Sequence, residues 1–245
     1  MPIYQNRFVY TILNDATRTA TLGDGSSVNG NGFVEKTSIS GTVDIPSSLN
    51  GYSLISLSHF SIRNCNQITE LILPHSLVQL DNAALTVCDS LTNLVFPNSI
   101  RTFGDFIDFF RIAKNITFER GSKLTSVGTH FLRYCHELEY LELPSSLISI
   151  QSLNCFEKNY KLKKIVYCGD GNFDSLDRFI DCPSNLIIEV SIRYPSLYFA
   201  GIKVSPCTNI TCISSIQNYL NRSIFCFQHS MYSILVINAI FTQNK

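Results

Sequence analysis

Apolar residues in the middle of the chain recur with a period of about 23 residues. A Leu-x-x-Leu pair or a variant of it occurs five times, at Leu54/Leu57, Leu77/Leu80, Ile100/Phe103, Leu124/Val127 and Leu147/Ile150. A second run, Leu-x-x-Leu-x-Leu, follows each pair in phase, at Ile68/Leu71/Leu73, Leu91/Leu94/Phe96, Ala113/Ile116/Phe118, Leu138/Leu141/Leu143 and Leu162/Ile165/Tyr167. Because a period between about 20 and 50 residues indicates a repeat architecture, we predict a stack of five units.

The second run has the two-residue alternation of a strand with one buried face. In the first unit it places Leu71 and Leu73 inward and Glu70 and Ile72 outward. One unit cannot bury its apolar edge alone, whereas stacking at about 4.8 Å per strand turns equivalent positions into continuous ladders. The pattern therefore predicts a β-rich solenoid of short parallel strands. The segment between the runs, such as residues 81–88, predicts a tight turn or one helical turn on the opposite side.

The turns after the strands carry Pro-x-Ser, beginning at Pro46, Pro74, Pro97 and Pro144. Proline ends ladder pairing and begins a turn. The third unit departs from this pattern, because it is one residue short between Phe103 and Ala113 and has Glu119-Arg-Gly-Ser, two residues longer, in place of the Pro turn. Such length changes are tolerated in surface turns and not in strands, which supports the strand assignment.

The two ends of the chain lack the repeat. Residues 3–22 alternate on either side of Asn14-Asp-Ala-Thr, which predicts a β-hairpin that caps the first edge of the solenoid. Gly23 to Gly32 predicts a flexible loop, and the repeat stops after Tyr167. We therefore divide the chain into a hairpin cap with a Gly-rich loop (1–40), five repeats (41–167), a Cys-containing C-terminal cap (168–212) and a loosely packed tail (213–245).

The segment Asp44-Ile-Pro-Ser-Ser-Leu-Asn-Gly-Tyr-Ser-Leu-Ile-Ser-Leu57 and the Pro-x-Ser-Leu-x-x-Leu units resemble BspA-like leucine-rich-repeat proteins over residues 41–167. The chain departs from that family where an Ala-Phe pair is common, with Ser61-Ile62, Ala84-Leu85, Phe131-Leu132 and Cys155-Phe156 in its place. The resemblance implies a right-handed leucine-rich-repeat array. It also implies a surface antigen or adhesin, located at the cell surface or secreted, that binds host matrix or other cells.

Composition and charge limit the classes of partner and the locations that we expect for the chain. Nineteen basic residues balance nineteen acidic ones, so the chain lacks the positive field that drives nucleic-acid binding. The first ten residues lack the pattern of a secretory signal, which favours a cytoplasmic location as the alternative. The late segment Ile224 to Phe241 contains Gln228, His229 and Asn238 and is too polar for a span of roughly 20 apolar residues, so membrane association is not expected.

No motif predicts catalysis, a cofactor or a metal. The glycine run lacks the Lys-Ser/Thr of a phosphate-binding loop, and no Gly-x-Ser-x-Gly occurs. Asp170, Asn172, Asp174 and Asp181 follow part of a calcium-loop pattern, but Ser175 replaces the required glycine, so a solvated acidic loop is the preferred interpretation. The histidines lack zinc spacing, and repeat positions facing solvent explain His75 and His130.

Seven of the nine cysteines fall into two groups. Cys65, Cys88 and Cys135 share one repeat phase and are expected to be small apolar ladder residues. Cys168, Cys182, Cys207 and Cys212 lie near the C-terminal cap, where at least two are expected to form a disulfide if the protein is exported. The sequons at Asn115, Asn209 and Asn221 become glycan sites only in a secretory pathway.

The outward strand residues form the candidate binding surface, because a repeat protein can vary them without changing its core. One row contains Glu70, Asn93, Asn115, Tyr140 and Lys164, and the next contains Ile72, Val95, Thr117, Glu142 and Val166. From these we select Glu70, Asn93, Thr117, Tyr140, Glu142 and Lys164 as candidate contacts of a protein or other macromolecular ligand. The alternative for the residues is plain solvent exposure, and the alternative for the protein is an intracellular protein-interaction scaffold.

Overall fold

The computed structural model describes residues 3–5, 7–26, 30–35, 38–151, 154–173 and 179–207. Up to Cys207 the chain forms one compact unit. The predicted tail at 213–245, the apolar segment Ile224 to Phe241, Cys212 and the sequons at Asn209 and Asn221 lie outside the described residues.

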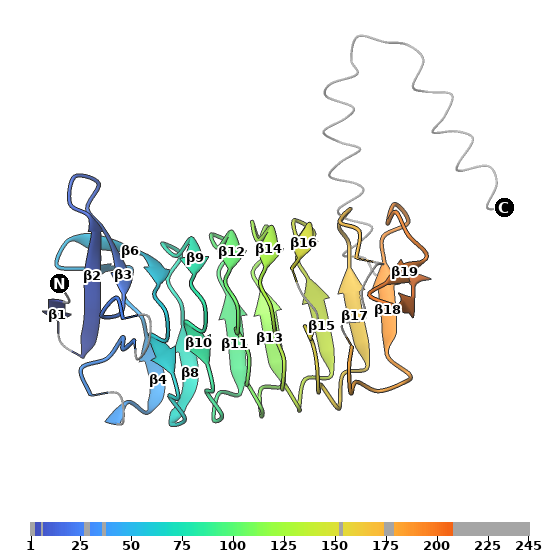
Figure 1. Ribbon diagram of the computed structural model, residues 1–245, viewed down its shortest axis with the longest axis horizontal. Coiled ribbons are helices and arrows are strands. Elements are labelled where there is room, and N and C mark those ends of the chain that lie inside the picture. The colour runs from blue at the N-terminus through green and yellow to red at the C-terminus, as the bar shows by residue number, and fades with distance from the viewer. Residues whose placement is uncertain are drawn as a thin grey trace, which may run out of the picture. The chain divides into compact units, whose positions relative to one another are not determined.

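The predicted parallel solenoid is confirmed. Short strands stack side by side along one axis, from the blue N-terminal end to the orange C-terminal end of Figure 1. Each turn of the chain contributes strands to two sheets. The upper sheet has the order β1-β2-β3-β6-β9-β12-β14-β16, with β5 paired to β6, and the lower strands form two sheets, β4-β8-β11-β13 and β15-β17-β18-β21.

The strands of the upper sheet are β1 (Ile3–Gln5), β2 (Phe8–Asn14), β3 (Thr19–Leu22), β5 (Ser48–Leu49), β6 (Tyr52–Leu57), β9 (Gln79–Leu80), β12 (Thr102–Phe103), β14 (Ser126–Val127) and β16 (Ser149–Ile150). Those of the lower sheets are β4 (Gly41–Asp44), β8 (Ile68–Ile72), β11 (Asn93–Phe96), β13 (Asn115–Phe118), β15 (Tyr140–Leu143), β17 (Lys164–Tyr167), β18 (Ile187–Val190) and β21 (Ser205–Pro206). The first Leu-x-x-Leu run of each unit thus forms the upper sheet and the second run forms the lower ones.

The core lies between the sheets and consists of the ladders that the sequence predicts. Leu71, Leu94 and Ile116 are paired in register and buried, as are Leu141 and Ile165. Ile72, one residue from Leu71, is exposed. The strand phase assigned from the sequence is therefore correct, because one residue of shift would exchange the two faces.

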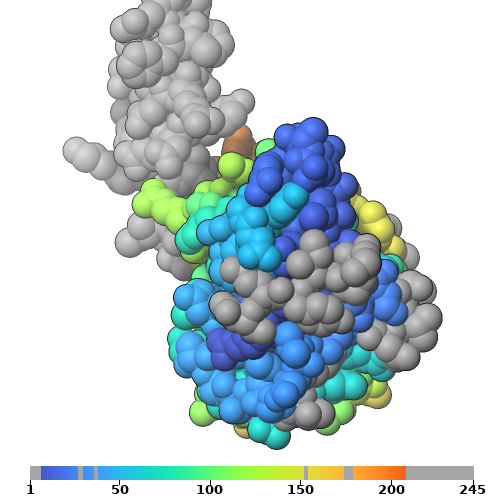
Figure 2. Space-filling model, turned by 90° about the vertical axis from the view of Figure 1, so that its left-hand side faces the viewer, coloured from blue at the N-terminus to red at the C-terminus, as the bar shows by residue number. Residues whose placement is uncertain are grey.

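The N-terminal hairpin is confirmed and caps the upper sheet. Strands β2 and β3 pair antiparallel, β1 adds to β2, and β3 pairs in parallel with β6 of the first repeat. Figure 2 views this end, with the dark-blue hairpin at its top. Two glycines of the segment that we predicted as a flexible loop, Gly23 and Gly30, lie directly against the first repeat. A Cβ at Gly30 would lie 1.8 Å from the His59 carbonyl oxygen, and one at Gly23 would meet Ser58, so close packing rather than flexibility explains why glycine occurs there. These glycines permit close packing on the first repeat.

Among the described residues, the third side of the solenoid, opposite the strand runs, consists of turns and two short strands, with no helical turn. Strands β7 (Ile62–Arg63) and β10 (Leu85–Thr86) pair in parallel there, and Thr86 forms a bridge to Asp108. Of the two predicted alternatives for this segment, the tight turn is the correct one. We call this side the turn face.

The parallel ladder continues past Tyr167, where we expected the repeats to end. Strand β18 pairs with all four residues of β17, and β21 pairs with β18. Above them β19 (Tyr198–Phe199) and β20 (Ile202–Lys203) form a small antiparallel pair, and Phe199 packs against Tyr167, Phe173 and Tyr194. This continuation could not be predicted from the repeat pattern, because the segment after Tyr167 lacks the Leu-x-x-Leu spacing.

Candidate binding surface

The strand face is the outward surface of β8, β11, β13, β15 and β17. Pairing places Glu70 beside Asn93 and Asn115 on one side of the face, and Tyr140 beside Lys164 on the other. The second row follows the same registers, with Thr117 beside Val95 and Glu142 beside Val166. The structure therefore brings the six candidate contacts to one face in two groups, Glu70, Asn93 and Thr117 in the first and Tyr140, Glu142 and Lys164 in the second.

Most outward positions are exposed, as predicted, and one is not. Glu70, Asn93, Thr117, Tyr140 and Glu142 are exposed, and Lys164 is half-buried. Val166 has an exposed fraction of 0%, so the prediction that it faces solvent is wrong. An alternating pattern gives the direction of a side chain, but it cannot show what lies over that side chain.

The polar side chains of the first group make weak contacts with their neighbours. The Asn115 amide nitrogen donates to the Asn93 side-chain oxygen at 2.8 Å, and the Thr42 hydroxyl donates to the Glu70 carboxylate at 3.0 Å. Both contacts are exposed to solvent, where such a hydrogen bond contributes about 1 kcal/mol or less. These side chains can exchange their present contacts for those of a partner.

Tyr140 is the largest side chain among the six candidates. It is 43% exposed, and its hydroxyl donates to the Glu142 carboxylate at 3.4 Å. Partial burial, followed by the negative charge of Glu142, raises the pKa of Tyr140 to about 12, so the phenol is neutral at physiological pH. The Lys164 ammonium lies 2.8 Å from the Glu189 carboxylate, which neutralises its charge. The sequence analysis could not find Glu189, since it lies outside the predicted repeats.

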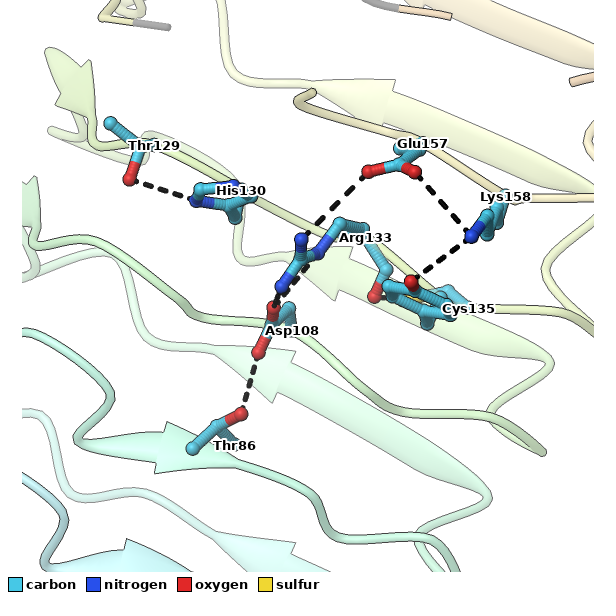
Figure 3. Close-up of polar contacts among 9 residues, drawn as sticks. Thr86, Asp108, Thr129, His130, Arg133, Cys135, Glu157 and Lys158 are labelled. Carbon is cyan, nitrogen blue, oxygen red and sulfur yellow. Dashed lines mark hydrogen bonds and ion pairs between the residues drawn. The ribbon is translucent and has the colours of Figure 1, made fainter. Parts of the chain in front are cut away.

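The turn face carries a second polar cluster, which the sequence analysis missed (Figure 3). Thr86, Asp108, Arg133 and Glu157 come from four successive repeats and form one row. The Thr86 hydroxyl donates to Asp108 at 2.5 Å, the Arg133 guanidinium donates to the other Asp108 oxygen at 3.1 Å, and Arg133 lies 3.8 Å from Glu157. Asp108 is only 1% exposed, and this burial raises the pKa of its carboxyl group.

Next to this row lies a row of residues in the left-handed backbone region: Val87, Phe109, Tyr134 and Lys158, with φ between 53° and 59°. The Phe109 and Tyr134 rings stack at 4.4 Å, and the Lys158 ammonium lies over Tyr134 at 4.9 Å and donates to its hydroxyl. Left-handed geometry costs a residue with a side chain about 1 kcal/mol or more. It is offset here because each amide donates to the next repeat, as Phe109 does to Arg133 and Tyr134 to Glu157.

The turn-face row does not have the features of a catalytic site. Arg133 neutralises Asp108, and Cys135, the neighbouring thiol, is fully buried, which raises its pKa and keeps it protonated. His130 stacks on Phe106 at 4.5 Å and is half-buried, so the prediction that it simply faces solvent is incomplete. Burial lowers the pKa values of His130 and His136, which favours their neutral forms. His75 is exposed, as predicted, and contacts Glu119 at 2.9 Å.

The described residues provide neither a metal-binding cluster nor a membrane-spanning helix. Within the described ranges, no three His, Cys, Asp or Glu residues are grouped closely enough to hold a metal ion. Asp170 lies 4.0 Å from Arg193, and Asp174 of the same acidic loop is outside the described residues. In the part of the chain that the structure describes, no helix has the length and apolar character needed to cross a bilayer.

The repeat cysteines are thiols, as expected, whereas the expected disulfide between two of the cap cysteines is not tested by the described residues. Cys65, Cys88, Cys135 and also Cys155 are buried thiols inside the repeats. Cys168 is disulfide-bonded, whereas Cys182 and Cys207 are thiols.

The turn-face row has a signal in the sequence that becomes visible when the repeats are aligned with a gap in the third unit. Arg63, Thr86, Asp108, Arg133 and Glu157 succeed one another at steps of 22 to 25 residues. Acidic and basic residues that alternate at one repeat phase predict a ladder of ion pairs, but the shortened third unit displaces Asp108 by one position and obscures the pattern.

Three comparisons with known proteins bear on this fold. A family model described as the BspA type leucine-rich-repeat region matches six copies, over residues 4–111 and 53–186. A search of curated proteins gives no match. Among solved structures, the T. pallidum leucine-rich-repeat protein TpLRR is similar with a TM-score of 0.60 and 18% identity, covering 81% of this chain and 92% of that one. The pneumococcal vaccine antigen PcpA is similar with a TM-score of 0.47 and 15% identity, covering 84% and 75%.

Proposed function

Because the chain belongs to the BspA-type leucine-rich-repeat family, we propose that it is a non-catalytic binding protein of the cell surface, an adhesin or surface antigen. Its partner is a protein or another macromolecule of a host matrix or cell. The strand face makes the contact, with Tyr140 as its main contact residue. Repeat proteins use extended strand surfaces in this way because the side chains there can vary without altering the core.

One observation carries the proposal: the strand face and the turn face use their outward side chains differently. On the turn face, charged and aromatic groups are bound to each other across repeats. On the strand face, Glu70, Asn93, Thr117, Tyr140 and Glu142 are exposed and have solvent-exposed contacts at most. A partner at the strand face therefore displaces weak contacts, whereas a partner at the turn face would have to break strong ones.

Tyr140 has the properties of a binding hot spot. Tyrosine supplies a large contact area and loses little rotamer entropy, and it is enriched where binding energy is concentrated. Its ring points to the side of the sheet opposite the buried ladder residues Leu141 and Leu143. Glu142 and the Lys164–Glu189 pair lie around it and provide a polar rim.

The runner-up function is an intracellular protein-interaction scaffold. The disulfide at Cys168 favours the surface role, because disulfides persist in oxidising compartments and are rare in the cytosol. Protease shaving of intact cells separates the two: loss of the untagged protein supports the surface role, and full protection supports the scaffold.

The binding test compares wild type, Tyr140→Ala and a triple variant that also changes Glu142 and Lys164 to Ala, in a pull-down or surface-binding assay against host cells and matrix. We expect Tyr140→Ala to weaken binding by about 1 to 3 kcal/mol. Asn93→Ala tests the first group of residues separately, and it should weaken binding only if that group also contacts the partner. Undiminished binding by a folded triple variant would move the site away from β15 and β17.

A further inference from the structure

We propose that the junction between the third and fourth repeats is a hinge that opens on the strand face. The lower strands form two separate sheets there, one ending at β13 and the next beginning at β15. The two strands are neighbours in the stack (Figure 1), and both lie wholly within the described residues. Every other pair of consecutive lower strands from β4 to β18 is hydrogen-bonded.

One repeat position shows the missing hydrogen bond directly. The residue just before β11, β13 and β17 donates its amide to the equivalent carbonyl of the preceding repeat: Thr92 to Thr69 at 3.3 Å, Lys114 to Thr92 at 3.0 Å, and Lys163 to Glu139 at 2.9 Å. The equivalent bond from Glu139 to Lys114 does not form within this described segment. An unpaired amide exchanges with solvent through smaller motions than a paired one.

The other two sides of the solenoid are continuous across the same junction. In the upper sheet the amides of Thr125 and Gly128 donate to Arg101 and Phe103. On the turn face the Asp108–Arg133 ion pair and the Phe109–Tyr134 stack cross the junction. A three-sided stack with one unpaired side has its lowest resistance to bending there, while the paired sides hold the repeats together.

The longer turn of the third repeat explains why the pairing fails. Its Glu119 carboxylate accepts from the Asn98 amide at 3.0 Å and contacts His75 at 2.9 Å, so the turn is bound to the two preceding repeats. The amide of Lys123 likewise donates to Asn98. The end of β13 is therefore held toward β11 and away from β15. The forward contact at this corner is made by a side chain, the Ser146 hydroxyl, which donates to Ser122 and Leu124.

The hinge lies between the two groups of candidate contacts on the strand face. Thr117 is on β13, whereas Tyr140 and Glu142 are on β15. Bending changes the separation of these groups and so fits the curvature of the face to a partner. The hinge itself does not depend on the proposed function, and it is tested without any partner.

Amide exchange measured by NMR on the wild-type chain tests the missing hydrogen bond. Lys114, Glu139 and Lys163 occupy the same repeat position, so the first and last are matched controls. We expect the Glu139 amide to exchange at least tenfold faster than both. Equal protection of all three would show that β13 and β15 are paired in solution, and the hinge would then be rejected.

Two further measurements test the cause and the motion. Deletion of Arg120 and Gly121 restores the turn length of the other repeats, and in the folded variant we expect Glu139 to become as protected as Lys163. Continued fast exchange would overturn the assigned cause. In the wild type, amide residual dipolar couplings fitted separately to residues 38–118 and 123–207 should give two alignment tensors of different magnitude. A single shared tensor would show a rigid junction and would contradict the hinge, whether or not the deletion variant folds.

Discussion

Two tyrosines of the fourth repeat, six positions apart, have opposite surroundings. Tyr134 on the turn face stacks on Phe109, accepts a hydrogen bond from Lys158 and has a left-handed backbone. Tyr140 on the strand face is 43% exposed and contacts Glu142. The turn face uses its polar and aromatic groups to join successive repeats, whereas the strand face leaves most of them exposed to solvent.

The difference follows from backbone hydrogen bonding. Along most of the strand face the main chain joins the repeats, so the stack depends less on the outward side chains there. On the turn face the chain turns sharply, and beyond the short β7–β10 pair the repeats are joined by single amide contacts, which side-chain contacts at Asp108, Arg133 and Tyr134 supplement. At the junction of repeats 3 and 4, where the strand face loses its main-chain pairing, the turn face has its best-buried ion pair.

The largest expected effect concerns the inward side of the strand face. Leu94→Asp should lower the free energy of unfolding by about 4 kcal/mol or more, because it buries an unpaired carboxylate between Leu71 and Ile116. Asn93→Asp, on the exposed side of the same strand, is the matched control and should change stability little. Urea melts of both variants make the comparison, and a similar loss in the two would contradict the strand phase.

A smaller loss is expected from the turn face. Arg133→Gln should lower the free energy of unfolding by about 2 to 3 kcal/mol, because it leaves the buried Asp108 carboxylate without its cation; the 17% exposure of Arg133 keeps the loss below that of a fully buried pair. Arg111→Gln removes a more exposed pair with Asp89 and serves as control. Equal stability of Arg133→Gln and wild type in urea would show that the row does not join the repeats.

A pH dependence of smaller size should distinguish Asp108 from surface carboxylates. Its pKa is raised in the folded state, so the folded protein retains a proton at pH values where the unfolded chain has lost it. The stability that this group contributes is therefore present below the ordinary carboxyl pKa and is lost as pH rises through the folded pKa. Across that range the wild type should lose stability relative to Asp108→Asn. Parallel pH profiles of the two proteins would contradict a raised pKa.

The sequence predicts which side of each strand is buried, but it does not predict the contacts of the turn face, and both results have physical reasons. A two-residue alternation fixes which side of a strand is buried, so Leu71, Leu94 and Leu141 were placed correctly. The left-handed residues Phe109 and Tyr134 could not be predicted, because that geometry normally selects Gly or Asn. The longer turn at Glu119 was visible in the sequence, but its effect on pairing depends on contacts with Asn98 and His75, which only the structure shows.

The most direct test of the account is one paired measurement: the free energy of unfolding and the binding to host cells or matrix for Tyr134→Ala and Tyr140→Ala. The account predicts that Tyr134→Ala loses about 1 to 2 kcal/mol of stability and binds as wild type when folded, because it removes a stacked ring from the turn face. Tyr140→Ala should keep its stability and lose about 1 to 3 kcal/mol of binding. A loss of stability in Tyr140→Ala with none in Tyr134→Ala would contradict the account. A loss of binding in Tyr134→Ala with none in Tyr140→Ala would also contradict it.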